Sequence, residues 1–490
     1  MNRRNFSILL GLAALARLPM LFDHFWYDEN FTLALVRLPF DRMLAAVIGD
    51  VHPPLFYVIA WMFGHWGGPA WLVRLPSFIA GLAALVVFRA VLDQLSLQPK
   101  TQQAALILLA FAPMQLHYDS EARMYALLLL LVLCCVWAIL AQRMVLQQVA
   151  LIALVYTHNW GLIYAASLAA LAMLYPWSGC DWRSWKLYLR FTPHMSKRYL
   201  APFLPVLLAW LPWAFVMRSQ MGTIAQAYWI TRVSPGQLAY YVFQQVWSVA
   251  LPNPVGFMVT WAWLVIGLVA MWKTYFSPWR VTLLAFLPLL LGVIVSLAWQ
   301  PVIIFRALIG TAPFLYIILA APFEWIYERR AAWHHEQPVI LRRALLAAVF
   351  LAPLVILAYP SLYAADFRGD NTIKVADYLK SHMRPGDLLV VGGDGGVINM
   401  LPYGYSPIMM TECGPALGGI SPATRAAIGF DIRPWSEIHA KRIWLFWGTT
   451  PLLPQCAADE FHAVVGQRVP VLSVQHDALT DTALWLVEEK

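Results

Sequence analysis

The chain has 490 residues, of which 61% are hydrophobic and only 12% are charged. One water-soluble globule cannot cover that much apolar surface, so the composition excludes a soluble protein. The formal net charge is +8, but the basic residues fall in loops between apolar stretches. That distribution indicates membrane orientation and argues against a nucleic-acid partner.

Apolar stretches long enough to cross a bilayer core of ~30 Å recur from Phe6 to Tyr359. The first follows Arg3 and Arg4, but Arg17 interrupts it and no small-residue cleavage sequence follows, so we expect an uncleaved span and not a signal peptide. The apolar segment 54–66 is short for a full crossing, and we expect it to be partly inserted. Eleven spans are expected, at 6–22, 71–92, 102–116, 124–142, 145–158, 161–176, 200–217, 256–272, 281–299, 305–327 and 342–360.

The basic loops fix the expected orientation. Loops 177–200, 273–280 and 328–343 are rich in Lys and Arg and should be cytoplasmic, which eleven spans satisfy. The C-terminal region then lies outside. The outer face carries loops 23–70, 116–123, 157–161 and 300–306, and the aromatic-rich segment 218–255, which we interpret as an interfacial anchor.

The composition changes after Pro360. Residues 361–490 hold no long apolar run and predict a small α/β domain, so we divide the chain into a transmembrane domain at 1–360 and an extracytoplasmic domain at 361–490. A helix is expected at 371–382, and strands from Leu388, at 442–447 and at 483–487.

Two smaller features of this domain carry little functional information. The glycine-rich stretch Gly392–Gly396 lacks the lysine spacing and the following helix of a phosphate loop, and we expect a plain turn. Cys413 and Cys456 either pair in a disulfide or stay free.

Mixed clusters of ionisable residues occur on the outer face only, which favours one extracytoplasmic site. The pair Asp28-Glu29 follows the first span. Two adjacent carboxylates could raise one pKa into the range of a general base, or bind a divalent cation, or remain ordinary surface acids.

A second cluster is Asp50-Val51-His52-Pro53-Pro54. The two prolines fix an extended backbone and hold His52 at the membrane surface, where it could contact a lipid phosphate. A helix stop with an interfacial histidine is equally compatible with the segment.

Two arginines precede spans on the outer face. The guanidinium fork of Arg123 or Arg306 matches two phosphate oxygens, although a single arginine at a span end often only snorkels to the interface. Together they favour an anionic headgroup. Arg74 is interpreted as the start of its span, and His158 lies in a short polar loop.

No nucleotide fingerprint, zinc-protease helix, nucleophile elbow or Cys/His metal spacing occurs in the sequence. Their absence argues against a nucleotide-sugar donor and against a metalloprotease. No cofactor is implied, although a divalent cation is compatible with the acid pair.

An ordered set of short motifs spans residues 1–330: Trp26-Tyr27-Asp28-Glu29, Asp50-Val51-His52-Pro53-Pro54-Leu55, Arg74-Leu75-Pro76-Ser77, Tyr118 to Leu127, Tyr156-Thr157-His158 and Phe305-Arg306. In this order and spacing they resemble the polyprenyl-phosphate-sugar-dependent glycosyltransferases of the GT-C fold. The nearest branch is that of the bacterial relatives of protein O-mannosyltransferases and lipid A aminoarabinose transferases.

The resemblance implies sugar transfer from a polyprenyl-phosphate donor, undecaprenyl phosphate being the expected carrier, to an envelope glycolipid, polysaccharide or protein at the periplasmic face of the bacterial inner membrane. Asp28 would be the general base and Glu29 would support it. The donor phosphate would be bound by His52, Arg123 and Arg306, with Asp50, Asp119, Glu121, Tyr125 and His158 in supporting roles.

The sequence departs from the aminoarabinose transferases at two positions. Phe31 stands where they carry an arginine, and His52 stands where they carry a lysine. A transporter or flippase is the main competing hypothesis, but such a protein usually has two matching halves, which this sequence lacks. An oligosaccharide ligase, which normally lacks the first-loop acid pair, and a non-catalytic membrane scaffold are two further hypotheses.

Overall fold

A computed structural model describes residues 1–174, 201–226, 230–247, 254–275, 278–329, 372–410, 420–449, 470–475 and 481–488. Their contacts form two compact units. The first comprises 1–21, 76–213 and 230–364, and the second comprises 22–75, 214–229 and 365–490. The helices of the first loop therefore group with the C-terminal residues, so the two units do not follow a division of the chain at residue 360.

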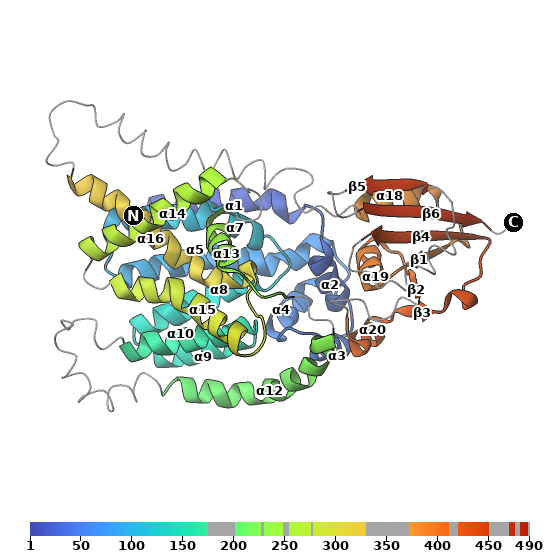
Figure 1. The fold of residues 1–490 in the computed structure, drawn as a ribbon, viewed down its shortest axis with the longest axis horizontal. Coiled ribbons are helices and arrows are strands. Elements are labelled where there is room, and N and C mark those ends of the chain that lie inside the picture. Colours follow the sequence, from blue (N-terminus) through green and yellow to red (C-terminus); the bar gives the residue numbers. More distant parts are fainter. Residues whose placement is uncertain are drawn as a thin grey trace, which may run out of the picture. The chain divides into compact units, whose positions relative to one another are not determined.

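The first unit is helical (Figure 1). Its elements are α1 (Arg3–Leu21), α5 (Leu75–Gln94), α6 (Pro99–Phe111), α7 (Pro113–Tyr118), α8 (Tyr125–Leu140), α9 (Met144–Val155), α10 (Trp160–Leu174), α13 (Pro235–Trp247), α14 (Pro254–Thr274), α15 (Pro278–Ala298), η4 (Phe305–Thr311) and α16 (Ala312–Arg329). Helix α12 (Phe203–Gln226) continues from this unit into the second.

Five helical segments of the described residues are long and apolar enough to cross a membrane: Arg3–Leu21, Ala70–Gln94, Gly256–Thr274, Pro278–Ala298 and Phe305–Glu324. Each corresponds to an expected span. Shorter apolar helices occupy the positions of three more, at Tyr125–Leu140, Met144–Val155 and Trp160–Leu174. The chain is therefore a multi-pass membrane protein.

Close helix packing builds the core of this unit. Residues 312–324 of α16 are buried except for the half-buried Phe323. Helix α14 approaches α16 at Gly267, where a Cβ atom would collide with the backbone oxygen of Ile318. One turn before Gly267, Trp263 donates its indole N–H to the oxygen of Leu319 at 2.9 Å. A small residue at the crossing and a polar bond beside it are the usual means by which membrane helices associate.

The expected span at 102–116 is not one continuous helix, because the helix breaks at Ala112. Helix α6 ends at Phe111, and Ala112 is extended, with φ −59° and ψ 135°. Pro113 disfavours the helical conformation of the residue before it and has no N–H to donate, so α7 begins as a separate helix. The break leaves carbonyl oxygens of the last turn of α6 without helical partners.

The segment 218–255, expected as an interfacial anchor, is largely helical in its described parts. Helix α12 runs on to Gln226, and Pro235–Trp247 forms α13, whose residues Val242–Val246 are buried. The second half of α13 is therefore packed in the first unit, whereas Pro235–Gln237 at its start are exposed.

The second unit combines the loop helices α2 (Tyr27–Val36), α3 (Phe40–Gly49), α4 (Leu55–Gly64) and η1 (Ala70–Arg74) with α18 (Thr372–His382), α19 (Asp394–Met400), η6 (Leu401–Tyr403), α20 (Pro422–Ile428), η8 (Trp435–Glu437) and six strands. The strands are β1 (Leu388–Val391), β2 (Ile408–Met410), β3 (Asp431–Arg433), β4 (Arg442–Thr449), β5 (Leu472–Gln475) and β6 (Asp481–Glu488). The helix expected at 371–382 and the three expected strands are present.

The six strands form one mixed sheet in the order β3-β2-β1-β4-β6-β5, with β3, β2, β1 and β4 parallel and β6 antiparallel to both neighbours (Figure 1). Alternate residues of β1 face opposite sides, as the strand period requires. Leu389 and Val391 pack with Leu379 of α18 and Val397 of α19, whereas Val390 joins the core on the other face.

The expectation of a plain turn at Gly392–Gly396 is wrong, because α19 begins at Asp394. The buried Asp394 accepts a bond from the backbone N–H of Ile420 at 2.9 Å and pairs with Arg425 at 2.8 Å. It therefore joins β1 and α19 to the segment that leads into α20. The basic loop 177–200, the expected span 342–360 and both Cys413 and Cys456 lie outside the described residues.

Candidate active site

The acid pair lies in the first turn of α2, in the second unit. Helix α2 begins at Tyr27 after the extended Trp26, so Asp28 and Glu29 stand at its positively polarised end, which favours carboxylates. Glu29 is fully buried, and Asp28 is half-buried. The helix thus gives the two neighbouring acids different surroundings.

Glu29 is bound by Arg74, which the sequence suggested only as a span start. The Nε and Nη2 atoms of Arg74 each donate to one carboxylate oxygen of Glu29 at 2.7 Å, and both side chains are buried. Arg74 also donates to the backbone oxygens of Asp23 at 2.6 Å and His24 at 2.8 Å. It therefore fixes both the chain turn before α2 and the acid in its first turn.

The segment around His52 connects α3 to α4. Helix α3 ends at Gly49, Asp50 is its C-cap, and the half-buried His52 precedes the two prolines. Within this unit α20 holds the end of α3, because the Thr424 hydroxyl donates to the oxygen of Ala46 at 2.9 Å. A Cβ atom at Gly49 would crowd the Thr424 and Ser421 hydroxyls, so this close approach requires glycine.

Arg123 and Arg306 lie in the first unit. There they come together with two other sequence-predicted residues, Tyr125 and His158. The Arg306 guanidinium carbon lies 5.8 Å from the ring centre of Tyr125, and that ring lies 5.9 Å from the His158 ring. Arg123 and Arg306 both act electrostatically on His158. The α7–α8 connection supplies Arg123, the start of α8 supplies Tyr125, the α9–α10 loop supplies His158, and η4 supplies Arg306.

His158 is kept neutral in this cluster. Burial lowers the pKa of His158 to about 3, and the charges of Arg123 and Arg306 act in the same direction. Its Nδ1 accepts the backbone N–H of Trp160 at 3.0 Å, so in the neutral ring the hydrogen is on Nε2. His158 therefore presents an N–H donor and no charge.

Asp119 and Glu121 are buried in the same unit but have different partners. Asp119 is paired with Arg17 of α1 at 2.7 Å. Glu121 lies 3.7 Å from the Nε2 atom of His117, one turn earlier. The Asp119 side chain is thus bound to α1. Glu121 lies within the short connection that carries Arg123.

Sequence reasoning missed the contribution of α13. The Gln245 amide donates to the backbone oxygen of Phe305 at 2.8 Å, directly before Arg306, and the backbone oxygen of Gln245 accepts the Tyr316 hydroxyl at 2.6 Å. The Tyr241 ring lies 6.0 Å from the Phe305 ring. Tyr241 and Gln245 are four residues apart, a helical spacing that the aromatic interpretation of this segment overlooked.

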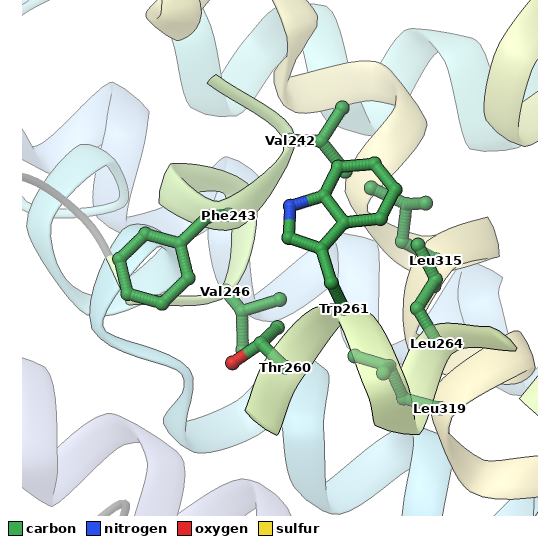
Figure 2. A pocket seen from close by; sticks show the side chains of 8 residues that line it. All are labelled: Val242, Phe243, Val246, Thr260, Trp261, Leu264, Leu315 and Leu319. Atoms are coloured by element: carbon green, nitrogen blue, oxygen red, sulfur yellow. The ribbon is translucent and has the colours of Figure 1, made fainter. Parts of the chain in front are cut away.

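The opposite flank of α13 lines a small apolar recess with α14 and α16. Figure 2 shows the Trp261 indole of α14 lying between the side chains of α13 and Leu315 of α16. The lining residues are Val242, Phe243, Val246, Thr260, Trp261, Leu264, Leu315 and Leu319. Helix α13 therefore contacts Phe305, the residue before Arg306, and also lines an apolar recess.

In the described ranges no three or more His, Cys, Asp or Glu side chains are placed to hold a metal ion. A search against protein-family models gave no match, and neither did a search of curated protein sequences.

The likeness to solved structures extends over nearly the whole chain. The crystal structure of ArnT from Cupriavidus metallidurans in the apo state aligns with a TM-score of 0.59 and 14% identity, covering 98% of this chain and 97% of that one. The structure of the same protein bound to undecaprenyl phosphate aligns with a TM-score of 0.57 and 13% identity, covering 99% and 98%. At this identity the likeness concerns the fold alone. The chain has the GT-C fold of ArnT, as the resemblance of its motifs predicted.

Proposed function

We propose that the protein is a membrane glycosyltransferase that moves a sugar from a polyprenyl-phosphate donor to an envelope acceptor at the periplasmic face of the bacterial inner membrane. The observation that carries the proposal is the cluster of Arg123, Arg306, Tyr125 and His158, which offers two guanidiniums and a neutral N–H donor in a largely buried place. Such a set suits a phosphate. Eleven spans, with the C-terminal residues on the outer side, belong to the same proposal.

In this reaction Asp28 takes the proton from an acceptor hydroxyl or phosphate, whose oxygen attacks the anomeric carbon of the donor sugar. The bond between that carbon and the phosphate oxygen breaks, and polyprenyl phosphate leaves with one more negative charge. Arg123 and Arg306 stabilise that charge, and His158 donates a hydrogen bond through Nε2. His52 is a further candidate for the phosphate.

The surroundings of the acid pair support a division of roles. Glu29 is occupied by two bonds from Arg74, whereas Asp28 is half-buried in the same helical turn. Arg74 and Glu29 therefore orient the turn, and Asp28 is the base.

The test of the reaction is Asp28→Asn, with Asp41→Asn as its control. Asp41 is also an acid in the first turn of a ten-residue loop helix, but it is exposed. Cells that lack the protein and carry each variant are compared by mass spectrometry of envelope glycolipids and glycoproteins. Loss of a general base should lower sugar transfer ~10²- to 10⁴-fold, so the modification disappears with Asp28→Asn and persists with Asp41→Asn. Unchanged modification with Asp28→Asn would refute the catalytic role.

The test of the phosphate cluster is Arg306→Ala in the purified protein in lipid nanodiscs, with undecaprenyl phosphate as the probe. Loss of a charge-assisted hydrogen bond should raise Kd by about 10-fold or more. An unchanged Kd would refute the role of Arg306.

A further inference from the structure

The connection between α7 and α8 is an unusually buried polar segment. Its five residues run from Asp119 to Arg123 (Asp-Ser-Glu-Ala-Arg), and their exposed fractions lie between 0% and 4%. Burial of so many polar groups is costly unless each has partners. The partners of this segment therefore show what holds it in place.

The first partner is Arg17 of α1, at the start of the segment. Its Nε and Nη2 atoms both donate to one carboxylate oxygen of Asp119, at 2.9 and 2.7 Å. Its Nη1 atom donates to the backbone oxygens of Ala13 at 2.9 Å and Ala110 at 2.7 Å. The second oxygen belongs to the last turn of α6, where the helix break at Pro113 removes helical partners.

The second contact is the face of α5, which meets both ends of the segment. The Ser77 hydroxyl donates to the backbone oxygen of Arg123 at 2.9 Å. One turn later, Gly81 faces the Asp119 side chain, and a Cβ atom there would overlap with the carboxyl group. Positions four residues apart lie on one helix face, so one stripe of α5 fixes both the first and the last residue of the segment.

We infer that Arg17, Ser77 and Gly81 are positioning residues that hold the Asp119–Arg123 segment in the register that directs the Arg123 side chain to the donor phosphate. The inference rests on the proposed function. None of the three acts on the phosphate itself. Together they set the backbone at both ends of the segment before the donor arrives, which is the preorganisation that electrostatic stabilisation requires.

The inference gives Asp119 and Arg123 different tasks within one short motif. The Asp119 carboxylate anchors the segment to α1, and the Arg123 guanidinium is the group that meets the ligand. Ser77→Ala is the most selective substitution, because the Ser77 hydroxyl bonds only to the backbone oxygen of Arg123. That hydrogen bond survives when the Arg123 side chain is removed.

The experiment is a double-variant cycle of Ser77→Ala and Arg123→Ala in the full chain, purified into lipid nanodiscs. Both the Kd for undecaprenyl phosphate and the thermal midpoint are measured. Ser77→Ala alone should raise Kd by about 5-fold, the equivalent of one neutral hydrogen bond. In the Arg123→Ala background Ser77→Ala should leave Kd unchanged and still lower the thermal midpoint, because only the backbone bond is then lost.

A matched control is Ser167→Ala. Ser167 is also buried, but its hydroxyl bonds to Ile163 within its own helix α10 at 2.9 Å, so its removal should not alter Kd. An equal loss of affinity from Ser77→Ala in both backgrounds would overturn the inference, as would no loss in either. If Arg123→Ala itself leaves Kd unchanged, Arg123 does not bind the phosphate, and both the inference and that part of the proposed function fail.

Discussion

Each of the two units of the molecule contains a buried guanidinium–carboxylate pair. The two pairs have the same chemistry but hold different parts of the structure in place. Arg74 and Glu29 belong to the second unit, Arg17 and Asp119 belong to the first, and both arginine side chains are wholly buried. Each arginine also donates to backbone oxygens of neighbouring turns. The Arg74 pair closes the loop that leads into α2, whereas the Arg17 pair joins separate helices across a helix break.

The difference between the pairs predicts different consequences for function. Arg74 sets the orientation of the helical turn that carries Asp28, so its loss should change the rate of the chemical step. Arg17 anchors the segment that carries Arg123, so its loss should change stability and phosphate affinity. Removing either partner leaves a buried charge, which costs far more than replacing both.

The largest expected effect is that of Arg17→Met. The variant leaves Asp119 buried without its guanidinium and removes the donor to Ala110, so the free energy of unfolding should fall by about 3–5 kcal/mol. Denaturant unfolding of the detergent-solubilised protein measures it. The double variant Arg17→Met/Asp119→Leu should recover part of the loss, because no buried charge remains. A single variant as stable as the parent would contradict the anchoring role.

Gly81→Ala attacks the same anchor without touching its charges. The added methyl group overlaps with the Asp119 carboxyl and should cost about 1–3 kcal/mol through overpacking. The control is Gly11→Ala in α1, where no atom lies within 4 Å of the new Cβ, and which should be neutral or stabilising by up to about 1 kcal/mol. The thermal unfolding midpoints of the two variants are measured and compared with that of the parent protein. If the two changes have equal effects, α5 does not constrain Asp119.

Arg74→Lys tests the Arg74–Glu29 pair by keeping the positive charge and removing the planar guanidinium group. A lysine cannot bond both oxygens of Glu29 while also reaching the carbonyls of Asp23 and His24. Turnover with the acceptor found by mass spectrometry should fall about 10-fold, a loss of about 1.4 kcal/mol, while the Kd for undecaprenyl phosphate stays unchanged. A raised Kd with normal turnover would reverse the assignment of the two pairs.

The contrast between the pairs also shows what a sequence can reveal about this protein. Hydropathy locates the long spans, because the bilayer imposes a length and an apolar composition on each of them. The same criterion marks Arg17 as a charge inside a span. It cannot identify Asp119 as the partner, since that contact depends on how α1, α5 and α6 pack.

Three further features could not be predicted, for related reasons. Pro113 stands in the sequence of the expected span 102–116, but an apolar proline does not interrupt hydropathy, so hydropathy does not predict the helix break. Helix α13 was missed because its aromatic residues resemble an interfacial belt, whereas its buried Gln245 contacts η4. The grouping of the first-loop helices with the C-terminal residues depends on contacts such as that of Asn30 with Asn399, 369 residues away.

His158 differs from both pairs, because it is a buried ionisable group that stays neutral. Its pKa is lowered to about 3, first by burial and then by Arg123 and Arg306. Between pH ~6.5 and ~3 the unfolded chain therefore binds a proton that the folded protein does not, so folding stability falls as the pH falls through that window and is unaffected above it.

His158→Gln should remove this dependence while keeping a polar side chain beside Trp160. Relative to the variant, the parent protein should lose up to about 1.4 kcal/mol per pH unit below pH ~6.5, the smallest of the expected effects over the range in which both proteins stay folded. Unfolding midpoints from pH 8 to pH 5.5 measure it, and pH 8 supplies the baseline because the residue is neutral in both states. Parallel pH profiles would mean that the pKa of His158 is the same in the folded and the unfolded protein, so that burial and the two arginines do not keep the folded residue neutral at pH 5.5.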